Sequence, residues 1–195
     1  ERESFQRNQI ERGLIETSNE DIIMISDVDE IPNFEKINFS KIDEYVYAFS
    51  QIHTMYKLNL IRDYNWIGTK LCKKKILISP QWLRSLKVKK KYSILRLDKY
   101  FSKTYYSKFK IVEDGGWHFG WLRKSDEIIK KINSYAHTEH NITKNNNRNY
   151  IEECMERGVS FLNNNEKLLL SEKKNFLPKY ILNNIDHYKE WIKEK

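Results

Sequence analysis

A short apolar run that ends in acidic residues constrains the fold more than any other part of this sequence. Four consecutive apolar residues, Ile22–Ile25, stand just before Asp27 and Asp29. A continuous run of this kind predicts a strand buried on both faces, as in a mostly parallel sheet. Pro32 has no N–H to donate to a sheet, so the strand is expected to end before it, and a short helix is expected over 33–37.

The rest of the chain mixes strand and helix patterns before it becomes helical. Strands are expected over 45–61 (two strands joined by a bend near His53), 66–72 and 109–112, and helices over 2–17, 81–87, 148–157, from Ser125 and from Pro178. This order predicts an α/β domain over 1–160, with a mixed sheet and flanking helices, followed by a helical C-terminal extension over 161–195.

Composition narrows the possible classes of protein. With 195 residues, of which 39% are hydrophobic, the chain can form a core and is not expected to be disordered. Its net charge of +8 attracts anions. The lysine clusters at 73–75 and 87–91 have the pattern of solvated faces and come without a nucleic-acid-binding motif, so no nucleic-acid partner is expected. No apolar run approaches the roughly 18 residues that cross a bilayer, so no transmembrane segment is expected in this chain.

The spacing of Asp27 and Asp29 points to metal chemistry. Side chains two apart on an extended chain share a face, and at the end of a strand they would project into the crevice where α/β sheets bind ligands. Two adjacent carboxylates repel each other unless a cation intervenes. Mn²⁺ or Mg²⁺ would accept both oxygen ligands, leave positions for phosphate oxygens, and stabilise the charge on a departing diphosphate. The structural alternative is that both residues form a polar turn with Pro32.

The same residues fit a second class of enzyme less well. An apolar strand followed by Asp-x-Asp also opens the haloacid-dehalogenase-like phosphatases, in which the first Asp is the nucleophile. That family has Thr or Val where Glu30 or Ile31 stands, and it needs an acidic pair after a later apolar strand, which the sequence lacks.

A glycine pair precedes two further candidates, Trp117 and His118. Gly115 and Gly116 allow unusual backbone angles and a close approach to a ligand. The imidazole of His118 suits Mn²⁺, and the alternative is a histidine hydrogen-bonded in a strand. Trp117 either stacks on a sugar face of the bound donor or fills the core.

Four segments together resemble glycosyltransferase family 17. They are Glu3-Ser4-Phe5-Gln6-Arg7-Asn8, Ile25-Ser26-Asp27-Val28-Asp29-Glu30-Ile31-Pro32, Gly115-Gly116-Trp117-His118-Phe119 and Lys131-Ile132-Asn133-Ser134-Tyr135-Ala136-His137-Thr138-Glu139. Their order and approximate spacing agree over residues 1 to about 160. The resemblance implies a GT-A-like nucleotide-sugar transferase fold, here without its N-terminal nucleotide-binding β-α-β portion. It also implies a UDP-sugar donor, specifically UDP-N-acetylglucosamine, inversion at the anomeric carbon, and a glycan or polysaccharide acceptor.

The resemblance also suggests how the donor and its metal are held. Asp29 is expected to be the direct metal ligand, with His118 as a further ligand. Asp27 would bind the donor ribose, or the metal through water. Arg7 would face the diphosphate or the nucleotide base with its fork of donors, and the alternative is a pair with Glu3 one helical turn before it.

Inverting transfer also needs one general base that deprotonates the acceptor hydroxyl. By analogy with inverting glycoside chemistry, this base lies opposite the leaving group. Asp114, next to the glycines, is the first candidate, and Glu139 and Glu30 are alternatives.

A different class of function stays open beside the transferase. The chain is alternatively a catalytically inactive module that binds glycans or phosphates. Its richness in Lys, Asn and Ile is typical of an AT-rich genome and leads us to expect a microbial or viral source and a cytoplasmic location; a eukaryotic source would instead imply the Golgi lumen. The oligomeric state is left open.

Overall fold

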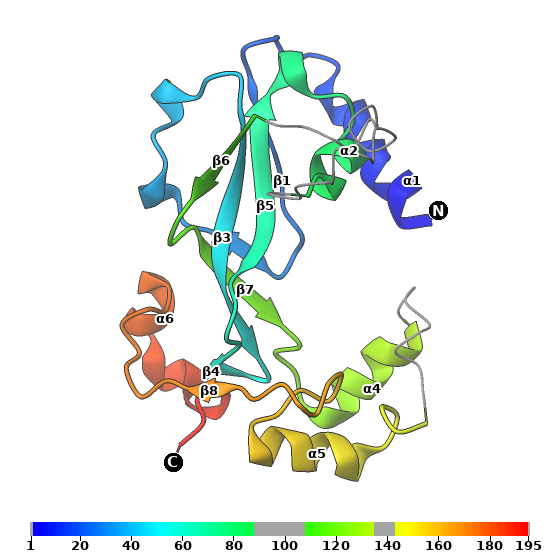
Figure 1. The fold of residues 1–195 in the computed structure, drawn as a ribbon, viewed down its shortest axis with the longest axis vertical. Coiled ribbons are helices and arrows are strands. Elements are labelled where there is room, and N and C mark those ends of the chain that lie inside the picture. Colours follow the sequence, from blue (N-terminus) through cyan, green and yellow to red (C-terminus); the bar gives the residue numbers. More distant parts are fainter. Residues whose placement is uncertain (1, 88–107, 135–142, 195) are drawn as a thin grey trace, which may run out of the picture. The chain divides into compact units, whose positions relative to one another are not determined.

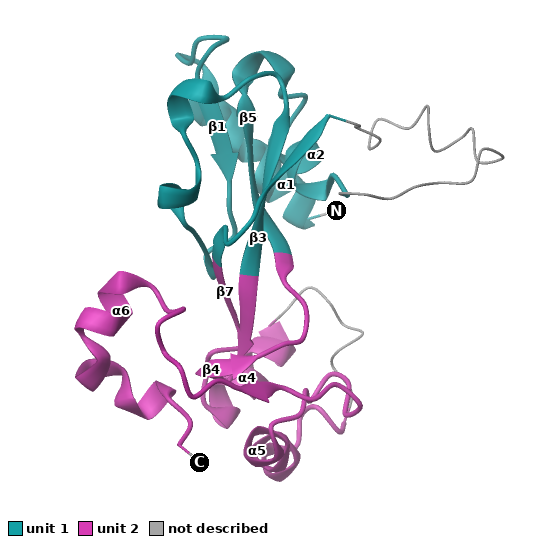
Figure 2. Ribbon diagram, turned by 60° about the vertical axis from the view of Figure 1, so that its left-hand side comes forward, with its two compact units in different colours: residues 1–51, 67–116 teal, residues 52–66, 117–195 magenta. Residues whose placement is uncertain are grey.

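The computed structural model describes residues 2–87, 108–134 and 143–194, and its elements are drawn in Figure 1. The fold is mixed α/β, with a mixed sheet and flanking helices, which confirms that part of the prediction. The chain divides into two compact units, residues 1–51 with 67–116 (unit 1) and residues 52–66 with 117–195 (unit 2), shown in Figure 2. The units do not divide at residue 160, because the described residues after it pack within unit 2.

Unit 1 contains a mixed sheet in which the first strand lies at one end. Its strands are β1 (Ile22–Ile25), β5 (Trp66–Lys73, from residue 67 on), β3 (Val46–Met55, up to residue 51) and β6 (Phe109–Val112). β1 is antiparallel to β5, and β3 is parallel to β6. The prediction that β1 lies in a mostly parallel sheet is therefore wrong, because β5 pairs with it in the antiparallel direction. The apolar run has another cause: Ile23 and Ile25 pack into one hydrophobic cluster, whereas Ile22 and Met24 pack against a second.

The helices of unit 1 lie before β1, between residues 34 and 41, and after β5. They are α1 (Arg2–Asn8), the 3₁₀ helices η1 (Gln9–Leu14), η2 (Phe34–Lys36), η3 (Phe39–Lys41) and η4 (Lys74–Ile76), and α2 (Pro80–Ser85). α2 begins as predicted from its sequence, because the Ser79 hydroxyl accepts a hydrogen bond from Trp82 N at 3.1 Å and Pro80 occupies the first turn. α1 joins α2 through Asn8, whose side-chain oxygen accepts from Gln81 N at 3.0 Å.

Unit 2 combines short strands with the later helices. Its elements are the end of β3, β4 (Lys57–Ile61), β7 (Gly116–Gly120, from residue 117 on), β8 (Leu169–Leu170), α4 (Ser125–Ser134), α5 (Arg148–Arg157), α6 (Lys179–Asn183) and the 3₁₀ helix η6 (Ile185–Trp191). β3 is antiparallel to β4 and parallel to β7, and β4 is antiparallel to β8. The predicted bend lies at Tyr56, which adopts a positive φ of 64°.

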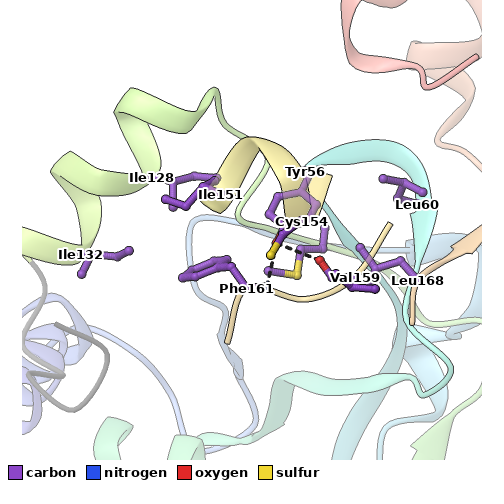
Figure 3. Close-up of a cluster of buried hydrophobic side chains, with 10 residues drawn as sticks. Tyr56, Leu60, Ile128, Ile132, Ile151, Cys154, Val159, Phe161 and Leu168 are labelled. Atoms are coloured by element: carbon purple, nitrogen blue, oxygen red, sulfur yellow. Dashed lines mark hydrogen bonds between the residues drawn. The ribbon is translucent and has the colours of Figure 1, made fainter. Parts of the chain in front are cut away.

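The main core of unit 2 forms where α4, α5 and the segment after α5 meet the strands (Figure 3). Tyr56 lies inside it, and its hydroxyl donates to Val159 O at 3.1 Å and accepts from Phe161 N at 2.8 Å. α5 ends at Gly158, whose left-handed φ of 63° is typical of a helix C-terminus. Phe161 is almost fully buried in this core, which is why the chain does not separate at residue 160.

Among the described residues, none of the helices combines the length and apolar character that crossing a membrane requires.

Candidate active site at the Asp27–Glu30 turn

The acidic motif forms a tight turn between β1 and β2 (Glu30–Pro32), not an extended chain. Glu30 N donates to Asp27 O at 3.0 Å, which closes the turn. Val28 is fully exposed at the tip, and Asp29 is partly exposed beside it. Asp27 and Asp29 therefore lie in a turn, not on the extended chain from which a shared face was expected.

Glu30 is the buried anchor of this turn. Its side chain is fully buried and accepts hydrogen bonds from Thr69 Oγ1 and Asp27 N, each at 3.2 Å. It also accepts from Arg84 Nη2 at 2.7 Å. A buried carboxylate needs such partners, because an unpaired charge in the interior is strongly unfavourable. This environment suits a structural counter-ion better than a general base that must reach an acceptor hydroxyl.

Two arginines contact Asp27 from different helices. Arg84, in the last turn of α2, donates to Asp27 Oδ2, and its Nη1 donates to Gly68 O at 2.8 Å. Arg7, in α1, places Nη2 3.6 Å from Asp27 Oδ1, and its Nη1 donates to Gln81 Oε1 at 2.5 Å. Arg7 therefore lies at the acidic motif, and its contact with a diphosphate or a nucleotide base stays a prediction.

Arg84 was missed by reasoning from the sequence. It stands 57 positions from Asp27, and nothing in its local sequence distinguishes it from any other basic residue near a helix end.

The side-chain amine of Lys70 donates a hydrogen bond to Arg84 O at 2.8 Å. Burial and the neighbouring Arg84 charge lower the pKa of Lys70 to about 8.

The carboxylate of Asp27 is poorly placed to bind a divalent cation directly. Both oxygens of Asp27 already face guanidinium groups, whose charge opposes a second cation there. In the described part of the chain, no group of three or more His, Cys, Asp or Glu side chains is arranged to hold a metal. Binding of a divalent cation by Asp29 stays a prediction; Mg²⁺ commonly binds one or two carboxylates and completes its shell with water and substrate phosphates.

The glycine pair approaches the protein's own backbone. Gly116 has a φ of +127°, and a Cβ there would lie 2.1 Å from Ile31 O. Asn33 N donates to Gly115 O at 2.8 Å, which ties this segment to the end of β2. The expected close approach is thus present, but its target is the segment that follows the acidic motif, not a ligand.

Replacing Gly116 by Ala is expected to destabilise the protein by about 1–3 kcal/mol from backbone strain alone, and by more if Ile31 cannot move. Gly13→Ala is the matched control: a Cβ at that position meets nothing within 4 Å, and its effect should stay within about 0.5 kcal/mol. Urea denaturation followed by circular dichroism measures both. Equal stability of the two variants would contradict the backbone contact.

Asp114 lies in the turn that precedes the glycines. It adopts a φ of 49°, which Asp tolerates better than most residues, and its side chain is 81% exposed. Lys36 Nζ lies 3.3 Å from its carboxylate. Its exposure leaves it available to a substrate hydroxyl, so it stays the first candidate for the general base. Glu139, the other alternative, lies outside the described residues.

His118 and Trp117 belong to unit 2, within β7. His118 lies opposite His53 of β3, with ring centroids 4.4 Å apart, and stacks on Trp66 at 4.8 Å. Gly120 makes room for this pair, because a Cβ there would lie 2.9 Å from His53 Nε2. The sequence predicted only that His53 lies near a bend. Its pairing with His118 was missed, because pairing between distant strands cannot be read from local sequence. The role of His118 as a ligand of a metal at Asp29 stays a prediction.

Trp117 is held by the C-terminal segment of unit 2. Its indole Nε1 donates to Phe176 O at 2.6 Å, and the residue is only partly exposed. Trp residues commonly satisfy their N–H in this way while the ring packs. Stacking of Trp117 on a sugar also stays a prediction.

Comparisons of the chain with protein-family models, with curated proteins and with solved structures find no match.

Proposed function

We propose that this protein is a metal-dependent inverting glycosyltransferase with a GT-A-like fold. It moves a sugar, N-acetylglucosamine from UDP-N-acetylglucosamine, onto a hydroxyl of a glycan or polysaccharide acceptor. The observation that carries the proposal is the meeting of three segments that resemble family 17. Arg7 of the first contacts Asp27 of the second, and Gly115 and Gly116 of the third pack on the end of the second.

This convergence supports a shared site because the three segments are far apart in the sequence. Within unit 1, Arg7 contacts Asp27 in the turn, and Gly116 packs on Ile31 in the strand that follows the turn. A structural turn alone needs neither a partly exposed Asp29 nor a nearby arginine from the N-terminal helix. Carboxylate and guanidinium groups side by side are suited to hold a cation and a diphosphate together.

In the proposed reaction, Asp29 would hold Mn²⁺ or Mg²⁺ together with donor phosphate oxygens. The metal would supply charge stabilisation for the departing diphosphate. Arg7 orients the donor, and Asp27, fixed by Arg84, is placed to accept a hydrogen bond from the ribose. Asp114 takes the proton of the acceptor hydroxyl, a role for which its exposed carboxylate is better placed than the buried Glu30.

A catalytically inactive phosphate-binding module is the second candidate. It is favoured by one observation, namely that guanidinium groups face both oxygens of Asp27. Such a module would bind the anion without turning it over. The two candidates differ in one expectation: the transferase needs a divalent cation to act on its ligand, whereas the binding module does not.

Thermal unfolding with UDP-N-acetylglucosamine and MnCl₂ is the first test. A ligand at a hundred times its Kd stabilises the folded state by about 2.7 kcal/mol. For a chain of this size that free energy corresponds to a rise in Tm of roughly 5–11 °C. The increase should disappear when EDTA replaces MnCl₂. ADP-glucose with MnCl₂ controls for nonspecific effects of a charged nucleotide.

Transfer itself is tested by release of UDP in the presence of a panel of glycan acceptors. Acceptor-dependent release that requires Mn²⁺ would support the transferase. Stabilisation that is equal with EDTA, without UDP release on any acceptor, would favour the binding module. Hydrolysis of an aryl phosphate with Mg²⁺ would contradict both and indicate a phosphatase.

A further inference from the structure

Two phenylalanine rings lie exposed next to each other on the segment of unit 1 that follows β2. Phe34 begins η2 and Phe39 begins η3, and the two residues are 54% and 41% exposed. Their ring centroids lie 5.6 Å apart at an interplanar angle of 70°, which is the edge-to-face arrangement that aromatic pairs favour. Exposed apolar surface is unfavourable in water, so a contiguous aromatic surface of this kind is a candidate binding surface.

The backbone that carries the two rings is held in place. Asn33 Oδ1 accepts a hydrogen bond from Glu35 N at 3.2 Å, and Asn38 Oδ1 accepts one from Ser40 N at 3.0 Å. Between the two rings in the sequence, Ile37 packs against a buried hydrophobic cluster of unit 1. Because this segment is already ordered, a ligand that binds to the rings loses little conformational entropy there.

The same segment is joined to the turn that carries Asp114. Asn33 N donates to Gly115 O at 2.8 Å, and Lys36 Nζ lies 3.3 Å from Asp114 Oδ2. Phe34 stands between these two contacts in the sequence, so it lies beside the turn of the candidate general base. An oligosaccharide that binds to Phe34 would therefore have a neighbouring sugar unit close to Asp114.

The chemistry of this surface favours a neutral sugar. The C–H groups on one face of a pyranose ring carry a partial positive charge, and they pack well on the electron-rich face of an aromatic ring. Nearby charges balance, because Glu35 and Asp114 offset Lys36 and Lys41, and all four residues are exposed. Such a mixture attracts neither a polyanion nor a polycation, but it offers hydrogen-bond donors and acceptors to sugar hydroxyls.

We propose that Phe34 and Phe39 form a stacking surface for a neutral sugar ring of the glycan acceptor, and that this surface brings a hydroxyl of the same glycan to Asp114. The two rings bind the acceptor away from the hydroxyl that reacts, so they select which glycan is used. That the glycan is an acceptor rests on the proposed function. Glycan binding by the rings does not, because it needs neither the donor nor a metal.

NMR titration of the full chain with cellotriose, chitotriose and mannotriose, without UDP-sugar or metal, tests the surface. Wild type should bind at least one of these trisaccharides at millimolar concentration. Phe34→Leu and Phe39→Leu each keep an apolar side chain but lose the flat ring, so each should weaken binding by about two- to tenfold. Tyr180→Leu is the matched control, because Tyr180 is 70% exposed on α6 of unit 2, and it should leave binding unchanged.

Phe34→Trp separates stacking from a structural role. Trp offers a larger flat face, so this variant should bind the trisaccharide at least as tightly as wild type, whereas loss of binding in both Phe34→Leu and Phe34→Trp would overturn stacking. Sedimentation velocity tests a competing occupant, which is a second copy of this chain. A dimer that dissociates in Phe34→Leu would show that the rings mediate self-association and would overturn the glycan surface. Circular dichroism checks that each variant is folded.

The results also separate this surface from the proposed function. Where transfer is observed, Phe34→Leu should raise KM for the acceptor severalfold and leave KM for UDP-N-acetylglucosamine unchanged. An unchanged acceptor KM in both leucine variants, or no binding of any trisaccharide by wild type, would overturn the surface even if Mn²⁺-dependent transfer occurs. Glycan binding that depends on the rings, without any transfer, would leave the surface standing and overturn the transferase.

Discussion

Asp29→Asn is expected to lower Mn²⁺-dependent sugar transfer by about a hundredfold or more, which corresponds to roughly 3 kcal/mol of lost transition-state stabilisation. The substitution preserves the shape of the side chain and removes the charge that would bind the cation. Asp29 is partly exposed at the turn, so the folded state should be little affected. The measurement is kcat/KM for UDP release across a range of Mn²⁺ concentrations, together with the melting temperature.

Asp126→Asn is the matched control, because Asp126 is an exposed carboxylate on α4 that pairs with Arg148 at 3.3 Å. It should transfer sugar at the wild-type rate. An Asp29→Asn enzyme with near-normal kcat/KM at low Mn²⁺ would remove Asp29 as the metal ligand. Replacing Asp27 should change the Mn²⁺ dependence of transfer less than replacing Asp29, because the Asp27 carboxylate is already paired with Arg7 and Arg84.

Arg84→Met is expected to lower the free energy of unfolding by about 3–5 kcal/mol, which is the usual effect of breaking a buried ion pair from one side. The reason is Glu30, whose fully buried carboxylate would lose its guanidinium partner. Met fills a similar volume, so packing alone accounts for little of the loss. Urea denaturation at pH 7 gives the free energy for each variant.

Glu30→Gln in the same chain provides the control for this prediction. Gln keeps an oxygen for Thr69 Oγ1 and Asp27 N but carries no charge. The double variant should therefore recover much of the stability that Arg84→Met loses, and a double-mutant cycle gives the coupling energy between positions 30 and 84. Additive effects of the two substitutions would show that Arg84 does not act through Glu30.

Elements with strong local signals were predicted close to where the structure has them. The 109–112 and 148–157 ranges agree with β6 and α5, because periodicity and the Gly158 stop signal are encoded within a few residues. The expected helix over 2–17 instead becomes α1 followed by the 3₁₀ helix η1 and ends at Leu14. Its apolar stripe is loose, so little burial is available to prolong it.

Elements that depend on a distant partner were missed. β7 (Gly116–Gly120) was not among the strands expected from the sequence. It becomes a strand through pairing with β3, where Trp117 lies opposite Ile52. Short strands gain most of their stability from such cross-strand neighbours, which a single segment of sequence does not specify.

The residues of the candidate site also divide into those with a local signal in the sequence and those that depend on a distant partner. Asp27, Asp29 and Arg7 could be selected from the sequence, because a motif after an apolar strand and a resemblance are both read along the chain. Arg84 could not, since only the packing of α2 beside α1 and β1 brings it to Asp27.

By itself, the sequence determined a mixed α/β fold, the position of an acidic motif after a buried strand, and the residues of that motif. These follow from hydrophobic patterning, proline and glycine chemistry, and helix caps, all of which act over a few residues. Only the tertiary structure decided that the motif forms a hydrogen-bonded turn, that Glu30 is buried, and that two arginines face Asp27. Those features arise because burial and charge pairing act through space between segments that the chain separates by tens of residues.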